Sequence, residues 1–169
     1  MIYLQKEEDR ITLAKIEALR TLFTLYQTCG ANGMLSLKHI TDRYKLNPGD
    51  FGRLLVKDGL VRKQIFSTKD FHATISIKGI EIVQPDYLPG HTSTIIRILG
   101  NKNEPTGIME MLGLNPKAYR LACDLADYFR KKKKIIELPI YKIDDVLIKL
   151  NRNGLEAFQE TKPFFYHLK

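Results

Sequence analysis

Residues 40–51 read Ile-Thr-Asp-Arg-Tyr-Lys-Leu-Asn-Pro-Gly-Asp-Phe, and this stretch indicates the fold of the chain more clearly than any other. It returns over residues 108–119 as Ile-Met-Glu-Met-Leu-Gly-Leu-Asn-Pro-Lys-Ala-Tyr. Both copies hold an isoleucine, a Leu-Asn-Pro triplet and a final aromatic residue at matching positions. In a chain of 169 residues, such a repeat predicts two small structural units rather than one domain.

Each residue type in the repeated stretch has a physical role at the junction of two helices. The isoleucine and the residue four positions later lie on one face of a first helix. Asn47 and Asn115 can accept hydrogen bonds from the free amides at the start of a second helix. A proline follows each asparagine, where its missing N–H would have no helical partner anyway. The pattern therefore predicts a helix-turn-helix, present twice.

The composition is typical of a globular protein, and the charge favours an anionic partner. Its net charge is +8, and residues 1–84 and 85–169 each carry +4, so the excess is not confined to one tail. No apolar run approaches the roughly 18 residues of a membrane span. The N-terminus lacks the order of a signal peptide, and Cys29 and Cys123 are expected as free thiols in a reducing compartment. We therefore expect a cytoplasmic protein without a membrane partner.

Hydrophobic periodicity and turn residues divide the chain into two domains and a linker. The first domain, residues 1–84, begins with a long helix over about 11–29 and ends with a hairpin and a short closing helix. Two prolines and a glycine mark residues 85–92 as the linker. The second domain, residues 93–169, repeats the order, with a long helix over 116–132 and a hairpin from 135–141 and 146–150. The fold class is mainly α-helical with small β-hairpins, an α+β class.

The order helix, helix, turn, helix, hairpin and closing helix resembles the winged-helix (winged helix-turn-helix) superfamily. The resemblance covers residues 11–83 and again 93–158, and it implies tandem winged helix-turn-helix domains. In the second copy it rests on Met111-Leu-Gly-Leu-Asn115. In the first copy Lys45 stands where a turn glycine is usual.

In the first copy, the third helix and the wing strand carry the resemblance. Leu54-Leu55, Gly59-Leu-Val61 and Ser76-x-x-Gly79 are similar to the third helix, first wing strand and final turn of bacterial transcription regulators of this class. Asn151-x-x-Gly154 echoes that final turn in the second copy. The resemblance implies that the third helix of each domain enters the DNA major groove.

In the first domain, the candidate DNA-binding residues lie on the third helix and the wing. Arg53 and Lys57 share its polar face, and an arginine fork fits a guanine edge. The alternative is a solvated helix face. The candidate wing contacts to the DNA backbone or minor groove are Arg62, Lys63 and Lys69. Lysines on a strand edge can equally serve only to prevent aggregation.

In the second domain, Lys117 and Arg120 begin the polar face of the third helix, but Asp124 and Asp127 continue it. An apolar row beside this face predicts either a broad core or a contact with another domain or subunit. The densest charge of the chain follows, and its candidate phosphate contacts are Lys131, Lys132, Lys133 and Lys134. Cations are also favoured at a helix C-terminus by its dipole, without any ligand.

No pattern in the sequence predicts catalysis, a metal or a cofactor. The four histidines and two cysteines have no metal-ligand spacing, and no nucleophile has a local partner. We therefore expect a double-stranded DNA-binding protein, a regulator of transcription. The alternatives are a protein-interaction scaffold, like the tandem winged helices of chromosome segregation and condensation subunits, and a replication initiator.

The two ends of the chain add apolar residues beyond the minimal winged-helix unit. Ile2 and Leu4 precede the first helix, and the tail holds Phe164, Phe165, Tyr166 and Leu168. These residues either cover their own domains or form a homodimer, which would match a palindromic DNA site.

Overall fold

A computed structural model of the chain describes residues 2–30, 33–66, 70–102 and 104–161, with only the backbone described for residues 2–5, 63, 64 and 66. The chain divides into two compact units, residues 1–87 and 88–169. Each is mainly helical with a small antiparallel sheet, which confirms the expected α+β class. The aromatic tail, residues 163–169, lies outside the described residues.

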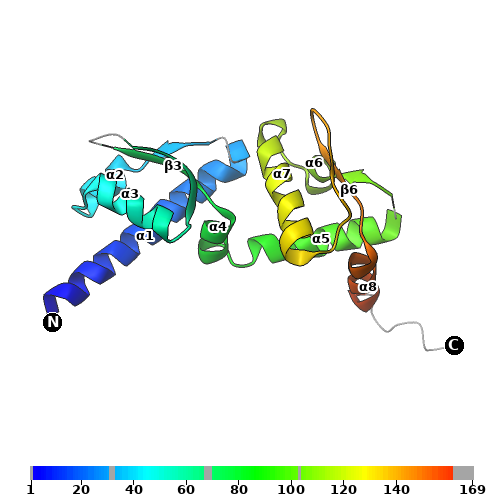
Figure 1. Cartoon of the computed structure of the whole chain (residues 1–169), viewed down its shortest axis with the longest axis horizontal. Coiled ribbons are helices and arrows are strands. Elements are labelled where there is room, and N and C mark those ends of the chain that lie inside the picture. The colour runs from blue at the N-terminus through cyan, green and yellow to red at the C-terminus, as the bar shows by residue number, and fades with distance from the viewer. Residues whose placement is uncertain (1, 31–32, 67–69, 103, 162–169) are drawn as a thin grey trace. The chain divides into compact units, whose positions relative to one another are not determined.

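The described part of unit 1 consists of helices and a small antiparallel sheet (Figure 1). Its elements are α1 (Ile2–Cys29), β1 (Leu35–Ser36), α2 (Lys38–Arg43), α3 (Pro48–Lys57), β2 (Val61–Phe66), β3 (Phe71–Ile75) and α4 (Ile77–Val83). The strands form an antiparallel sheet in the order β1-β3-β2, so the hairpin expected from the sequence is present.

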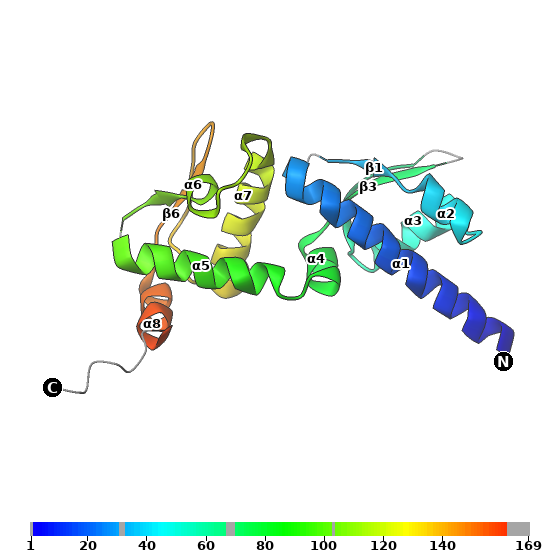
Figure 2. The same ribbon diagram turned by 180° about the vertical axis from the view of Figure 1, so that it is seen from behind.

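The core of unit 1 forms where α1 packs against β3 and α4. The buried side chains of α1 recur every three or four residues and include Ala18, Leu22 and Tyr26. Phe51 of α3 and Phe71 of β3 are also buried. Burying one such large side chain contributes about 1.5–3 kcal/mol. Figure 2 shows α1 lying along one side of the unit, with α2 and α3 on the other.

Unit 2 has the same order of elements with a longer third helical segment. Its elements are α5 (Tyr87–Lys102), β4 (Thr106–Gly107), α6 (Ile108–Leu112), the 3-10 turn η2 (Pro116–Ala118), α7 (Tyr119–Asp127), the π-helical segment η3 (Tyr128–Lys133), β5 (Ile140–Tyr141), β6 (Val146–Ile148) and α8 (Arg152–Thr161). Its antiparallel sheet has the order β4-β6-β5, which matches the strand order of unit 1.

Residues 85–92, expected as the linker between the domains, are helical from Tyr87 onward, where α5 begins. Pro89 is the third residue of that helix, and proline is tolerated in a first helical turn since the amides there have no helical partners. The hydroxyl groups of Thr92 and Thr94 donate hydrogen bonds to carbonyls four residues earlier. The composition of the segment thus indicates a helix start rather than a connection.

Two expectations for unit 2 also change in detail. The helix predicted over residues 116–132 is present as three consecutive segments, the 3-10 turn, α7 and the π-helical segment. The predicted hairpin is shorter, with β5 and β6 paired over two residues and an isolated bridge between Ile136 and Leu150. Pro139 lies between these two pairings, and proline has no N–H to donate to a neighbouring strand.

The repeated Asn-Pro turn has the predicted geometry in both units. The side chain of Asn47 accepts a hydrogen bond from the amide of Asp50 at 3.1 Å, and Asn115 accepts one from the amide of Lys117 at 2.9 Å. Lys45 has a φ of 51°, and Gly113 has a φ of 59°. Both turns therefore use the left-handed region, and unit 1 does so with a residue that lacks the freedom of glycine.

The closing turns of the two units are built alike. The hydroxyl of Ser76 accepts a hydrogen bond from the amide of Gly79, and the carboxamide oxygen of Asn151 accepts one from the amide of Gly154. The Ser76 amide also donates a hydrogen bond to the Leu60 carbonyl at 3.0 Å. In unit 2, the Asn151 amide donates to the Ile135 carbonyl at the same distance. The sequence echo between Ser76-x-x-Gly79 and Asn151-x-x-Gly154 therefore reflects one local geometry.

Candidate nucleic-acid interface

Helix α3 of unit 1 presents a polar face that is fixed by its cap and its core contacts. Asn47 caps its start, and Pro48 is its first residue. Phe51 and Leu55 are buried, which turns Arg53 and Lys57 to the opposite, exposed side. The predicted face of the third helix is therefore accessible to a ligand.

Arg53 forms an ion pair with Asp50, one helical turn earlier. The guanidinium Nη2 lies 2.6 Å from Asp50 Oδ1, and both side chains are 72% exposed. A pair this exposed contributes only about 0–1 kcal/mol. Arg53 can therefore leave Asp50 for a phosphate or a base edge at little cost, and its ion pair aims the guanidinium toward the start of α3.

The other predicted contacts of unit 1 lie at the end of α3 and on or beyond β2. Lys57 is exposed in the last turn of α3, and Arg62 is exposed on β2. Lys63 pairs with Thr74 in the backbone ladder, but its side chain is not among those described. Lys69 lies outside the described residues. The structure thus places Arg53, Lys57 and Arg62 on adjoining elements and leaves Lys63 and Lys69 without a described side-chain position.

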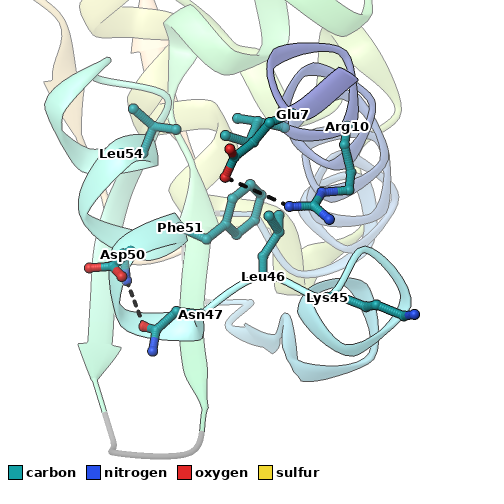
Figure 3. A pocket seen from close by; sticks show the side chains of 9 residues that line it. Glu7, Arg10, Lys45, Leu46, Asn47, Asp50, Phe51 and Leu54 are labelled. Carbon is teal, nitrogen blue, oxygen red and sulfur yellow. Dashed lines mark hydrogen bonds and ion pairs between the residues drawn. The ribbon is translucent and has the colours of Figure 1, made fainter. Parts of the chain in front are cut away.

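A cavity of about 260 Å³ borders the start of α3 and is closed on one side by α1 (Figure 3). Arg10 lines it and lies 3.7 Å from Glu7, while Asp50 and Asn47 line the α3 side. Leu46 and Phe51 form its apolar floor. The carboxylates of Glu7 and Asp50 balance the cationic side chains of Arg10 and Lys45. The lining of the cavity therefore does not favour an anion.

A salt bridge joins the end of α3 to α1 and was not anticipated from the sequence. Lys15 Nζ lies 2.7 Å from Asp58 Oδ2, and Lys78 donates a hydrogen bond to the Asp58 carbonyl. The hydrogen bond from Lys15 holds the pKa of the Asp58 carboxyl below its usual value. This contact anchors the C-terminal end of α3 and pairs the carboxylate next to Lys57 with a cation of α1.

In unit 2, Lys117 and Arg120 are exposed at the start of the third helical segment. Between them, the Tyr119 hydroxyl donates a 2.6 Å hydrogen bond to the Lys142 carbonyl in the turn between β5 and β6. Burial raises the pKa of Tyr119, and burial also raises the pKa values of Cys123 and Tyr141 beside it. These phenols and this thiol therefore stay neutral near pH 7, and they join the hairpin to α7.

The lysine cluster, residues 131–134, lies at the opposite end of that segment from Lys117. All four side chains are exposed. Lys131 pairs with Asp127 at 3.0 Å, and the Lys133 ammonium lies 5.7 Å from the centre of the Tyr128 ring. With about 1.5 Å of rise per residue, the cluster and Lys117 are roughly 20 Å apart. The predicted contacts of unit 2 therefore form two separate basic groups.

The acidic and apolar rows of α7 have local explanations. Asp127 is paired with Lys131, so it opposes a phosphate less than its position in the sequence suggested. Leu121, Leu125 and Tyr128 are buried. These three side chains of the apolar row are thus covered by other residues of the chain, as in a broad core.

Asp145 and Ile143, which the sequence did not single out, shape this surface together with Asn151. Asp145 accepts a hydrogen bond from the amide of Met109 at the start of α6, and Asn151 donates to the carbonyls of Lys134 and Ile136. Ile143, in the turn between β5 and β6, is 99% exposed. The only hint of the exposure of Ile143 in the sequence was its position between charged residues in a predicted turn.

The described residues contain no group of three or more His, Cys, Asp or Glu side chains placed to hold a metal ion. Among the described helices, none combines the length and the apolar character needed to cross a membrane. Comparison with protein-family models, with curated proteins and with solved structures finds no match. The geometry of the two units is therefore the basis of the functional proposal.

Proposed function

We propose that the two units are tandem winged-helix domains that bind double-stranded DNA and that the protein regulates transcription. In support, both units share one element order and one strand order, β1-β3-β2 and β4-β6-β5. In both, an Asn-Pro cap starts the helical segment that follows the turn. A fold of this kind hosts several functions, so the surface of these helices decides between them.

The observation that carries the proposal is the exposed cations directed toward the start of the third helical segment in each unit. In unit 1, Arg53 lies in the middle of α3, and its pair with Asp50 turns its guanidinium toward the helix start. In unit 2, Lys117 and Arg120 lie in the first turns of the segment. In helix-turn-helix proteins, the first residues of this helix contact the base edges, while other cations contact phosphates. Because the net charge of +8 is shared by both halves, both units can contribute phosphate contacts.

Binding to random duplex DNA across a salt series tests the phosphate contacts. Each phosphate that a cation neutralises contributes about 0.9 to the slope of log affinity against log salt. Changing Lys132, Lys133 and Lys134 to alanine should weaken binding to all sequences alike and reduce the slope by up to about 2.7.

The matched control removes three exposed lysines elsewhere, on α1, α2 and α5: Lys6, Lys38 and Lys102. It lowers the net charge equally and should change the slope much less. If both triple variants change the slope by the same amount, the lysine cluster contributes only net charge. Wild-type protein that shows no affinity for duplex DNA at any salt would contradict the proposal and favour the protein-interaction scaffold.

The expected contact between Arg53 and a base edge is tested by replacing this residue. Arg53→Ala should reduce discrimination between a selected site and random DNA by about 5- to 150-fold, the effect of losing about 1–3 kcal/mol of base contact. Arg97→Ala, which removes an exposed arginine from α5, is the control and should leave discrimination unchanged. If Arg53→Ala loses affinity for selected and random DNA equally, Arg53 contacts a phosphate rather than a base.

A further inference from the structure

The hairpin turn of unit 2 presents an apolar side chain that folding does not explain. The turn runs Lys142-Ile-Asp-Asp145, and the Lys142 amide donates a 2.8 Å hydrogen bond to the Asp145 carbonyl. Ile143 at its tip is 99% exposed. Tight hairpin turns favour Gly, Asn and Asp, and an isoleucine there gains nothing from burial in its own domain.

The tip is held in place from both sides. The Tyr119 hydroxyl donates to the Lys142 carbonyl at 2.6 Å, which ties the turn to the start of α7. Asp145 Oδ1 accepts from the Met109 amide at 2.9 Å, which ties it to the start of α6. Figure 1 shows the turn before β6 projecting beyond the neighbouring elements of the unit. Ile143 is therefore held in a fixed, exposed position at the tip of the turn.

The charges around the tip favour an anionic partner. Lys142, Lys117 and Arg120 are exposed in the turn and beside the Tyr119 contact. Asp144 in the turn and Glu110 on α6 oppose them. The carboxylate of Asp145 accepts two backbone amides, which compensates part of its charge. Asp124 and Asp127 lie beside Cys123 and Tyr141 but are half-buried, and Asp127 is paired with Lys131, so the fully exposed charges nearest the apolar tip are mainly cationic.

We propose that Ile143 enters the minor groove of bound DNA as an apolar wedge, while Lys142 of the same turn contacts a flanking phosphate. This proposal rests on the proposed DNA binding and deepens it. Apolar side chains that enter between base steps partly unstack them and bend the duplex. Pyrimidine–purine steps such as TA unstack most easily, so unit 2 should prefer sites that contain them, without hydrogen bonds to their bases.

A protein partner fits this hairpin less well. Leu138 and Ile140, 72% and 55% exposed, flank Pro139 immediately before β5 and at its first residue, and an edge strand can pair with another chain. Pro139 cannot donate to such a strand, and proline on an edge is a common device against this pairing. The apolar tip beside three cations is therefore better explained by DNA.

The test uses the full-length protein and a 30-base-pair duplex with dyes at both ends and 2-aminopurine beside a central TA step. Wild type should bring the dyes closer and raise the 2-aminopurine fluorescence. Ile143→Ala should reduce both signals several-fold and leave the salt slope unchanged, because it removes no cation. Ile143→Leu should restore both signals. Because Ile143 is exposed, the thermal unfolding of each variant should match that of wild type, which excludes misfolding.

The control variant is Ile82→Ala, which removes a 51%-exposed isoleucine from α4 and should keep both signals. Wild type that binds DNA without bending or unstacking it, or an Ile143→Ala variant with wild-type signals, would overturn the wedge while leaving DNA binding intact. Wild type that fails to bind the duplex at any salt would overturn both proposals and assign the exposed hairpin to a protein partner.

Discussion

Replacing Gly154 by alanine tests the closing turn of unit 2. A Cβ at this position would lie 2.2 Å from the carbonyl oxygen of Ile135 and 2.9 Å from a methyl group of Leu150. Non-bonded contacts below about 3 Å do not occur at ordinary Cβ atoms, so α8 or the strand before it must shift by close to 1 Å. The same carbonyl accepts the 3.0 Å hydrogen bond from the Asn151 amide, which the shift would weaken.

The size of the effect follows from three contributions. Overpacking of this kind costs about 1–3 kcal/mol, and weakening the Asn151 hydrogen bond costs up to about 1 kcal/mol. Removing a glycine from a helix returns about 0.5–1 kcal/mol. We therefore expect Gly154→Ala to lower the free energy of unfolding of unit 2 by about 2 kcal/mol. For a domain of this size, that corresponds to a Tm lower by about 8–16 °C.

Differential scanning calorimetry is the appropriate measurement, because two units can unfold in separate transitions. Gly90→Ala is the matched control, since a Cβ at Gly90 on α5 meets no atom within 4 Å. The control should raise the Tm, because alanine loses less conformational freedom than glycine in a helix. An unchanged or higher Tm for Gly154→Ala would refute the reasoning that Gly154 is required by the close approach of Ile135.

Three further predictions concern the turns and ion pairs of the two units. Asn47→Ala should cost about 1 kcal/mol in urea unfolding, whereas Asn47→Asp should retain the cap; equal losses would mean that the cap is unimportant. Lys45→Gly should stabilise unit 1 by about 0.5–1 kcal/mol, because glycine adopts the φ of 51° at this position without strain. Gly113→Ala should destabilise unit 2, because alanine is strained at the φ of 59° there. Changes in stability of the same sign would contradict the shared turn geometry. The pKa of Asp58 is lowered in the folded protein by Lys15, so the stability this pair contributes is present above about pH 4 and is lost as pH falls through the folded pKa. Asp58→Asn should therefore cost up to about 1 kcal/mol at pH 7 and progressively less below pH 4, and a pH-independent difference in urea unfolding would argue against the pair.

Features set by neighbouring residues could be predicted from the sequence. Asn47 and Asn115 cap helices because an amide oxygen two or three residues before a free N–H reaches it in almost any context. The equivalence of Ser76-x-x-Gly79 and Asn151-x-x-Gly154 follows from the same kind of local hydrogen bond. The first hairpin was evident because alternating apolar residues bury one face of a strand.

Contacts between distant residues required the tertiary structure. Asp145 accepts a hydrogen bond from the amide of Met109, 36 residues earlier, at the start of α6, and Lys15 pairs with Asp58 across 43 residues. Whether Arg53, Lys117 and the lysine cluster form one patch also depends on the backbone path, which places the last two at opposite ends of one helical segment. The exposure of Ile143 is of the same kind, since composition assigns an isoleucine to the core and only the course of the β5–β6 turn puts it in solvent. The sequence by itself therefore determined the caps, the turns and the twofold repeat, because these depend on residues a few positions apart, whereas the tertiary structure decided which charged and apolar side chains share a surface.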